Sequence, residues 1–178
     1  MKSSKEKILY LGLDPSRYPQ SDREVVHFPI IQTIPRPFES SEIQEAFRLF
    51  PSYSHLLFTS RTAVKITLEY GKRAGVRFSD KKIIAIGRAT AALLERVDLI
   101  SSKEHAEGVV DEIEQLDWHG AHFFFPRSSL ARPVIVDFFL REKIDHTAPV
   151  LYETHPNLSL EPTDLQPFEE LVFTSPST

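Results

Sequence analysis

HLLFTSRTAV, residues 55–64, joins a run of large apolar side chains to the beginning of a helical pattern. The run HLLF is almost continuously apolar, which is typical of a strand that is covered on both faces in a parallel sheet. Thr59 and Ser60 follow it, and a hydroxyl at this point caps the first turn of a helix. The stretch therefore predicts a strand that leads directly into a helix, the repeating unit of an α/β fold.

The same alternation continues along the whole chain. Short apolar segments predict strands at Lys7–Leu13, Val25–Ile34, His55–Thr59, Lys82–Ile86, Ala121–Phe125, Ala148–Glu153 and Glu170–Thr174. Amphipathic segments between them predict helices at about 41–50, 61–73, 88–96, 107–116 and 129–142. In the first of these helices, Ser41 and Gln44 have the spacing of a capping box. Strands that alternate with helices predict an α/β fold with parallel sheets.

Two connections indicate that the chain leaves one domain and later returns to it. Charged and proline-bearing stretches at 35–38 and 155–162 each follow an extended segment. Two extended crossings beside two connections predict that the middle of the chain, residues 34–152, is an inserted domain that holds most of the helices.

The composition is that of an ordinary globular protein. Hydrophobic residues are 41% and charged residues 26% of the 178 residues, and the formal net charge is −4. This weakly acidic balance argues against nucleic-acid binding, which depends on clustered Lys and Arg. The chain has no cysteine, which excludes disulfides and thiolate chemistry. No apolar run approaches membrane-spanning length, and Ile8–Leu13 is too short for a secretory signal, so we expect a cytoplasmic protein.

A second copy of the opening pattern occurs late in the chain, where LVFTSPS at 171–177 resembles LLFTSRT at 56–62. A capped helix beginning presents free N–H groups to an anion. Gly87, before a helix, and Arg127, after the run FFFP, mark two more turns of this character. Together these turns predict an anion-binding edge at the carboxyl ends of a parallel sheet. The alternative is that the hydroxyls only cap helices and that Arg127 is an ordinary solvated side chain.

The order of these motifs resembles that of the uroporphyrinogen-III synthase family. The resemblance lies in HLLFTSRTAV at 55–64, KKIIAIGRATAALLE at 81–95, AEGVVDEIEQL at 106–116, HFFFPRSSLARPVIVDFFLREKI at 122–144, VLYET at 150–154 and LVFTSPS at 171–177. Each motif alone carries little information, and the succession of motifs carries the resemblance.

The resemblance implies an α/β fold of two similar flavodoxin-like or Rossmann-like parallel-sheet domains, joined by a two-stranded connection, with the site in the cleft between them. Residues 1–33 plus 153–178 would form the second, discontinuous domain. That domain is expected to be incomplete in this chain, because Asp14-Pro15 and Pro19 leave little room for its first helix. The twin of the strand and GRATA turn at 83–91 would also lie beyond Thr178.

The resemblance further implies a lyase that cyclises hydroxymethylbilane, a linear tetrapyrrole with eight carboxylates, to uroporphyrinogen III. Ring D is inverted and water is lost, without a cofactor or a metal. The pair His119 and His122 has no third ligand at a suitable spacing, which also speaks against a metal site. The alternative is a truncated or degenerate relative, a non-catalytic α/β module that binds anions. We expect a monomer that contacts neither nucleic acid nor a membrane.

One residue is expected to act on the departing hydroxyl and several to hold substrate carboxylates. Tyr152 matches the tyrosine of the family's VLYET segment, and its phenol would donate a hydrogen bond to the leaving oxygen. The alternative is a tyrosine that only packs at the domain hinge. The expected carboxylate contacts are Ser60, Thr62, Thr90, Arg127, Ser128, Ser175 and Ser177.

Overall fold

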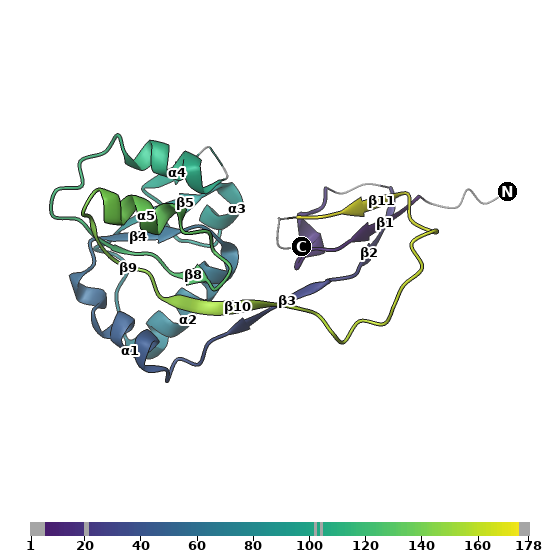
Figure 1. The fold of residues 1–178 in the computed structure, drawn as a ribbon, viewed down its shortest axis with the longest axis horizontal. Helices are drawn as coiled ribbons and strands as arrows, with labels where there is room; N and C mark the ends of the chain where they lie inside the picture. Colours follow the sequence, from purple (N-terminus) through teal and green to yellow (C-terminus); the bar gives the residue numbers. More distant parts are fainter. Residues whose placement is uncertain (1–5, 20–21, 102, 104, 175–178) are drawn as a thin grey trace. The chain divides into compact units, whose positions relative to one another are not determined.

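The computed structural model of the chain describes residues 6–19, 22–101, 103 and 105–174. The chain divides into two compact units, shown in Figure 1. Unit 1 comprises residues 1–34 and 154–178, and unit 2 comprises residues 35–153. Strands and helices alternate along the chain in an α/β architecture with parallel sheets, as the sequence predicts.

A five-stranded sheet forms the centre of unit 2. Its strands, in spatial order, are β6 (Leu99–Ser101), β5 (Lys82–Ile86), β4 (His55–Phe58), β7 (His122–Phe124) and β9 (Asp145–Thr147). Each neighbouring pair is parallel. The carboxyl ends of all five strands therefore meet at one edge of the sheet.

Helices cover both faces of this sheet (Figure 1). One face carries α1 (Ser41–Arg48) and α2 (Arg61–Ala74), and the other carries α4 (Ala106–Ile113) and α5 (Val134–Arg141). Side chains alternate between the two cores along a strand, so that Leu56 and Phe58 belong to the first and Leu57 to the second. The strand β4 is accordingly buried at every position, and three of its four residues are apolar.

Unit 1 contains a smaller parallel sheet in the order β11 (Glu170–Val172), β1 (Lys7–Tyr10) and β2 (Glu24–His27). Ile8, Leu9 and Tyr10 of its central strand are buried. A short 3₁₀ turn, η1 (Pro15–Arg17), follows β1 where a full helix would otherwise stand. The Asp14 carboxylate caps this turn by accepting a hydrogen bond from Ser16 N (3.1 Å).

A third sheet runs in the order β3 (Ile31–Pro35), β10 (Val150–Pro156) and β8 (Arg127–Ser128). The chain passes from unit 1 to unit 2 within β3 and returns within β10. Among the described residues, no helix has both the length and the apolar composition needed to cross a membrane.

Several predicted elements are longer than those in the structure. The predicted strand Val25–Ile34 is two strands, because Pro29 between them has no N–H group for a ladder. The predicted helix at 88–96 is only α3 (Arg88–Ala91). From Leu93 onward the amide groups bond three residues back instead of four, which tightens the backbone and ends the helix.

Other differences arise where the chain makes short local structures. The predicted helix at 129–142 begins only at Val134, because the Ser128 hydroxyl accepts a hydrogen bond from Leu130 N (3.2 Å) and turns the backbone. A 3₁₀ turn, η2 (Phe50–Ser52), replaces the end of the first predicted helix. The strands β6, β8 and β9 were not predicted, since two or three residues are too few for a hydrophobic pattern.

Candidate functional site

Three of the predicted site residues meet at the carboxyl edge of the unit 2 sheet. The hydroxyl oxygens of Tyr152 and Ser60 lie 2.9 Å apart. Tyr152 is also the register partner of Ser128 in the pairing of β10 with β8, and the Ser129 N–H donates to the Tyr152 carbonyl (3.0 Å). The site thus gathers hydroxyl groups from three segments that are distant in the sequence.

Ser60 stands where β4 ends and α2 begins. Its Oγ accepts a hydrogen bond from Ala63 N (3.0 Å), so it caps the helix as the sequence predicts. A hydroxyl has one proton and two lone pairs, so Ser60 can still exchange a second hydrogen bond with Tyr152. Capping and contact with the phenol therefore coexist, and the two interpretations of this serine do not exclude each other.

The surroundings of Tyr152 keep its phenol protonated. The residue is buried, with 6% of its surface exposed, and it belongs to the core of unit 2. Burial raises the pKa of the phenol above its ordinary value, while hydrogen bonds with Ser60 and Ser128 lower it in part. At neutral pH Tyr152 is therefore a hydrogen-bond donor and not a phenolate.

Arg127 lies in β8 beside the same strand as Tyr152. Its backbone N–H donates to Pro149 O (3.0 Å), and its Nε donates to Ala148 O (3.3 Å). These two bonds hold the guanidinium side chain against the segment that leads into β10. Arg127 is half-buried, which agrees better with a held side chain than with a freely solvated one.

The remaining predicted contacts lie on neighbouring turns or outside the described residues. Thr62 is half-buried in the first turn of α2. Thr90 is buried in α3, which follows β5, the strand next to β4. Gly87, the residue before α3, has φ +71°, a conformation that favours glycine. Ser175 and Ser177 lie outside the described part of the chain.

Two arginines at this edge were missed by the sequence analysis. Arg61 and Arg88 are the first residues of α2 and α3, and neither helix has an acidic residue in its first turn. A cation at a helix N-terminus interacts unfavourably with the positive end of the helix dipole. The helices α1, α4 and α5, in contrast, each carry an acid in the first turn. The signal in the sequence was an arginine in the turn after the strand, three residues after Phe58 in FTSRT and two residues after Ile86 in IGRAT.

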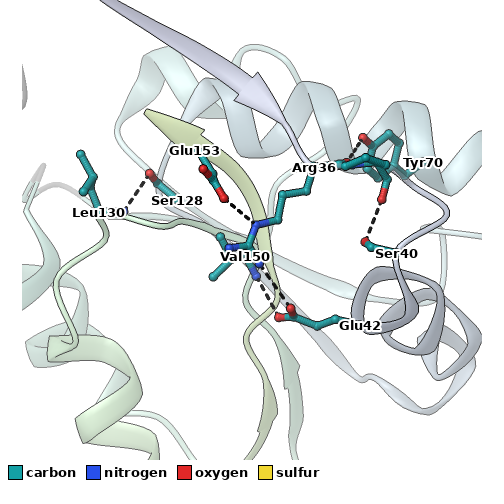
Figure 2. A network of polar contacts seen from close by, with 9 residues as sticks. Arg36, Ser40, Glu42, Tyr70, Ser128, Leu130, Val150 and Glu153 are labelled. Carbon is teal, nitrogen blue, oxygen red and sulfur yellow. Dashed lines mark hydrogen bonds and ion pairs between the residues drawn. The ribbon is translucent and has the colours of Figure 1, made fainter. Parts of the chain in front are cut away.

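A polar network that the sequence analysis also missed lies along β10 (Figure 2). Arg36 contacts Glu153 through Nε (3.2 Å) and Glu42 through an Nη (3.4 Å). Glu42 in turn accepts a hydrogen bond from Val150 N (3.4 Å). No local pattern could have indicated this network, because Arg36 and Glu153 are 117 positions apart.

A cavity in unit 2 lies at a different place. A shallow cavity of about 380 Å³ is lined by Trp118, Ala121, Ile144, Asp145 and their neighbours, at the amino ends of β7 and β9. It is therefore at the opposite edge of the sheet from Tyr152. Within the described ranges, no three His, Asp or Glu side chains gather as a metal-binding group.

Comparison with known proteins identifies a family. The family model described as uroporphyrinogen-III synthase HemD matches residues 18–178. No curated protein matches the chain.

Solved structures show the same fold at low sequence identity. The chain is similar to a mutant uroporphyrinogen III synthase from the extremely thermophilic bacterium Thermus thermophilus, with a TM-score of 0.62 and 14% identity over 85% of this chain and 64% of that one. For the wild-type Thermus thermophilus enzyme the TM-score is 0.56, with 14% identity over 85% of this chain and 63% of that one. For uroporphyrinogen-III synthetase from Helicobacter pylori it is 0.51, with 17% identity over 86% and 65%. The chain thus spans slightly less than two thirds of the length of these relatives. The match of the family model over most of the sequence, on a fold shared with solved members, shows that this chain belongs to the uroporphyrinogen-III synthase family.

Proposed function

We propose that the protein is a uroporphyrinogen-III synthase, a lyase that cyclises hydroxymethylbilane to uroporphyrinogen III. The hydroxyl of the substrate leaves as water, ring D is inverted through a spiro intermediate, and the macrocycle closes. The pyrrole nitrogens supply the electrons, so the protein has to fold the substrate and assist the departing hydroxyl. The observation that carries this proposal is the buried phenol of Tyr152, held at Ser60 on the carboxyl edge of a sheet with the family fold.

Tyr152 is proposed as the residue that assists departure of the hydroxyl. A protonated phenol can donate a hydrogen bond to the leaving oxygen and thereby stabilise the developing charge. The raised pKa of Tyr152 supports this role, because a phenolate could not donate. Ser60 already lies at hydrogen-bond distance from the phenol and would hold it in place until the substrate oxygen takes over that bond.

The turns after the parallel strands are proposed to hold substrate carboxylates. Backbone N–H groups and hydroxyls converge there, and parallel sheets bind ligands at this edge. The proposed contacts are Ser60, Thr62, Thr90, Arg127, Ser128, Ser175 and Ser177, with Arg61 and Arg88 added from the structure. In this proposal unit 2 is the inserted domain.

The decisive assay supplies the protein with hydroxymethylbilane and separates the product isomers. The proposed enzyme yields isomer III, faster than the spontaneous closure yields isomer I. If only isomer I accumulates, at the rate seen without protein, the proposed function is wrong for this chain. Heat-inactivated protein serves as the control, because it retains the composition without the fold.

Tyr152→Phe tests the role of the phenol. We expect kcat to fall about a hundredfold, since general-acid assistance contributes on this scale. The free energy of unfolding should fall by only about 1 kcal/mol, the net contribution of one hydrogen bond. Tyr53→Phe is a matched control, because the Tyr53 hydroxyl is also buried and donates to Ala46 O (3.0 Å) in the core. Tyr53→Phe should lower the free energy of unfolding by a similar amount without lowering kcat. If both variants lower kcat equally, Tyr152 has only a packing role.

The second candidate is a non-catalytic module that binds polycarboxylates. The arginines at the beginnings of α2 and α3 favour it, because they suit an anion whether or not a reaction follows. Calorimetric binding of hydroxymethylbilane without formation of isomer III would support this candidate over the enzyme. Failure to bind would contradict both.

A further inference from the structure

The pairing of β10 with β8 does little to fix the position of Tyr152. On one side β10 pairs only with the two residues of β8, and the register shifts between Val150 and Tyr152. A short and irregular ladder specifies register weakly. On its other side β10 pairs with β3, and Arg36 directly follows β3. Side-chain contacts at this point add to the pairing with β3 and help to hold the phenol within hydrogen-bond distance of Ser60.

Arg36 and Glu42 contact residues of β10 that precede and follow Tyr152 in the sequence, and Figure 2 shows their contacts with Val150 and Glu153. Before Tyr152, Glu42 accepts from Val150 N (3.4 Å), and Arg36 N donates to Leu151 O (2.8 Å). After Tyr152, Arg36 Nε donates to the Glu153 carboxylate (3.2 Å). The Arg36 Nη group reaches the other oxygen of Glu42 (3.4 Å), which links the two halves of the network.

The network is anchored on the helix that also carries Ser60. The Tyr70 hydroxyl, near the end of α2, donates to the Arg36 carbonyl (2.6 Å). Ser60 caps the beginning of the same helix and contacts the Tyr152 phenol. The two anchor points are about 15 Å apart along the helix axis, given a rise of about 1.5 Å per residue. The rigid helix α2 therefore fixes the distance between two contacts. One is the bond from Tyr70 to Arg36, which holds β10, and the other is the contact between Ser60 and the Tyr152 phenol.

We propose that Arg36 is a positioning residue, which sets β10 so that the Tyr152 phenol meets Ser60. The proposal rests on the proposed function in assigning Tyr152 to the departing hydroxyl. The side chain of Arg36 is 34% exposed and that of Glu153 39%, so the ion pair is screened by water and is ill suited to a purely stabilising role. Its guanidinium is planar and carries donors in a fixed fork, which suits a residue that must hold two carboxylates in a set geometry.

The first test measures whether Arg36 maintains the bond between Tyr152 and Ser60, without any need for activity. In the parent chain, Tyr152→Phe and Ser60→Ala should be non-additive in the free energy of unfolding, because both remove one shared hydrogen bond. In the Arg36→Gln background we expect the two changes to become additive. Should Arg36→Gln fail to fold, the same cycle in Arg36→Lys decides, since lysine retains the charge but cannot hold both carboxylates.

Arg141→Gln is the matched control for this cycle. Arg141 also bridges two glutamates, Glu114 (2.5 Å) and Glu142 (2.8 Å), but it lies at the end of α5, away from Tyr152. The coupling between Tyr152 and Ser60 should survive in Arg141→Gln. Coupling that also survives in the Arg36 variant, or that disappears in the control, would overturn the proposal.

The second test uses turnover. Arg36→Gln should lower kcat about tenfold with KM little changed, since displacement of a reacting group by a fraction of an ångström has effects of this order. In the Tyr152→Phe background the same substitution should have no further effect on kcat, and Arg36→Lys should recover part of the loss. An equal loss of kcat with and without the phenol would contradict a positioning role. If the parent chain forms no isomer III, the proposed function is wrong. The double-mutant cycle in unfolding would then still show whether Arg36 positions Tyr152 against Ser60.

Discussion

Ser60 illustrates how one oxygen can serve both the fold and the site. It caps α2 through Ala63 N and lies against the Tyr152 phenol. The capping bond is local and follows from the sequence, whereas the contact with Tyr152 depends on how β10 is placed. Ser60 therefore has a structural role in capping α2 in addition to its proposed role in holding the Tyr152 phenol.

We expect Ser60→Ala to lower the free energy of unfolding by about 1 kcal/mol or somewhat more, because an N-cap hydrogen bond is lost. Ser40→Ala is the control, since Ser40 is the N-cap residue of α1 but makes no side-chain capping bond. Urea unfolding followed by circular dichroism compares the two. Equal losses would show that the capping bond of Ser60 contributes nothing of its own.

The buried His55 and the half-buried His122 should make stability depend on pH. Burial, with Lys82 nearby, lowers the pKa of His55, and burial likewise lowers the pKa of His122. Above about pH 6.5 both histidines are neutral in the folded and the unfolded chain. As the pH falls below this value the unfolded chain takes up protons first, so stability is lost on the way down to the lower folded pKa.

Urea unfolding at about pH 7.5 and about pH 5.5 measures this effect, and the lower pH should give the smaller free energy of unfolding. His55→Phe should reduce the difference between the two pH values, since His55 already stacks on Phe123 (ring centroids 4.8 Å apart) and a phenyl ring suits that place. An unchanged difference would rule out His55 as a source of the pH dependence.

At the scale of elements, α2 is the helix on which the site depends. Ser60 caps its beginning, Tyr70 binds the Arg36 carbonyl near its end, and Gly75 closes it in the left-handed conformation with φ +66°. The Gly75 N–H donates to Lys72 O (3.3 Å), which satisfies one of the last carbonyls of the helix. Local rules thus account for both ends of this helix.

Gly75→Ala should destabilise the chain by about 1–2 kcal/mol, the cost of a left-handed conformation for a residue with a Cβ atom. The effect should be purely conformational, because a Cβ atom at this position has nothing within 4 Å. Gly75→Asn is the control and should cost less, since asparagine tolerates this conformation better. Thermal unfolding distinguishes the two variants, and equal losses would contradict the argument.

At the scale of the whole molecule, the two units differ in how much core they bury. Both large clusters of buried side chains belong to unit 2, around β4, β5 and β7. Aromatic rings contribute much of the first cluster, with Phe124 in contact with Phe47, Phe50 and Tyr53. Burial of each such ring contributes about 1.5–3 kcal/mol. In unit 1 the buried apolar residues are confined, among those the structure describes, to β1 and Leu11.

Native-state hydrogen exchange should reflect this difference. We expect the amides of β4 and β5 to exchange most slowly, in step with global unfolding. The amides of β1 and β2 should exchange through a separate opening at lower free energy. Phe124→Ala should lower the protection of β4 by about 3–5 kcal/mol while leaving that of β1 nearly unchanged. Equal protection of both units would show that they unfold as one.

The amino-acid order by itself determined the alternation of strands and helices, the anion-suited turns and the resemblance to the family. These features depend on apolar periodicity and capping, which act between residues that are close in the chain. The turn at Ser60 and the strand that carries Tyr152 were predicted for this reason, although the break at Pro29 was not.

Only the tertiary structure decided which of these residues meet. The Tyr152 phenol and Ser60 are 92 positions apart, and Arg36 and Glu153 are 117 apart. Such contacts depend on the order in which the parallel strands assemble and on the register of β10, and no local pattern in the sequence records either. The beginnings of α2 and α3 could be located from the sequence. That the arginines at both helix N-termini lie at one edge of the sheet follows only from the pairing of β4 with β5 in the structure.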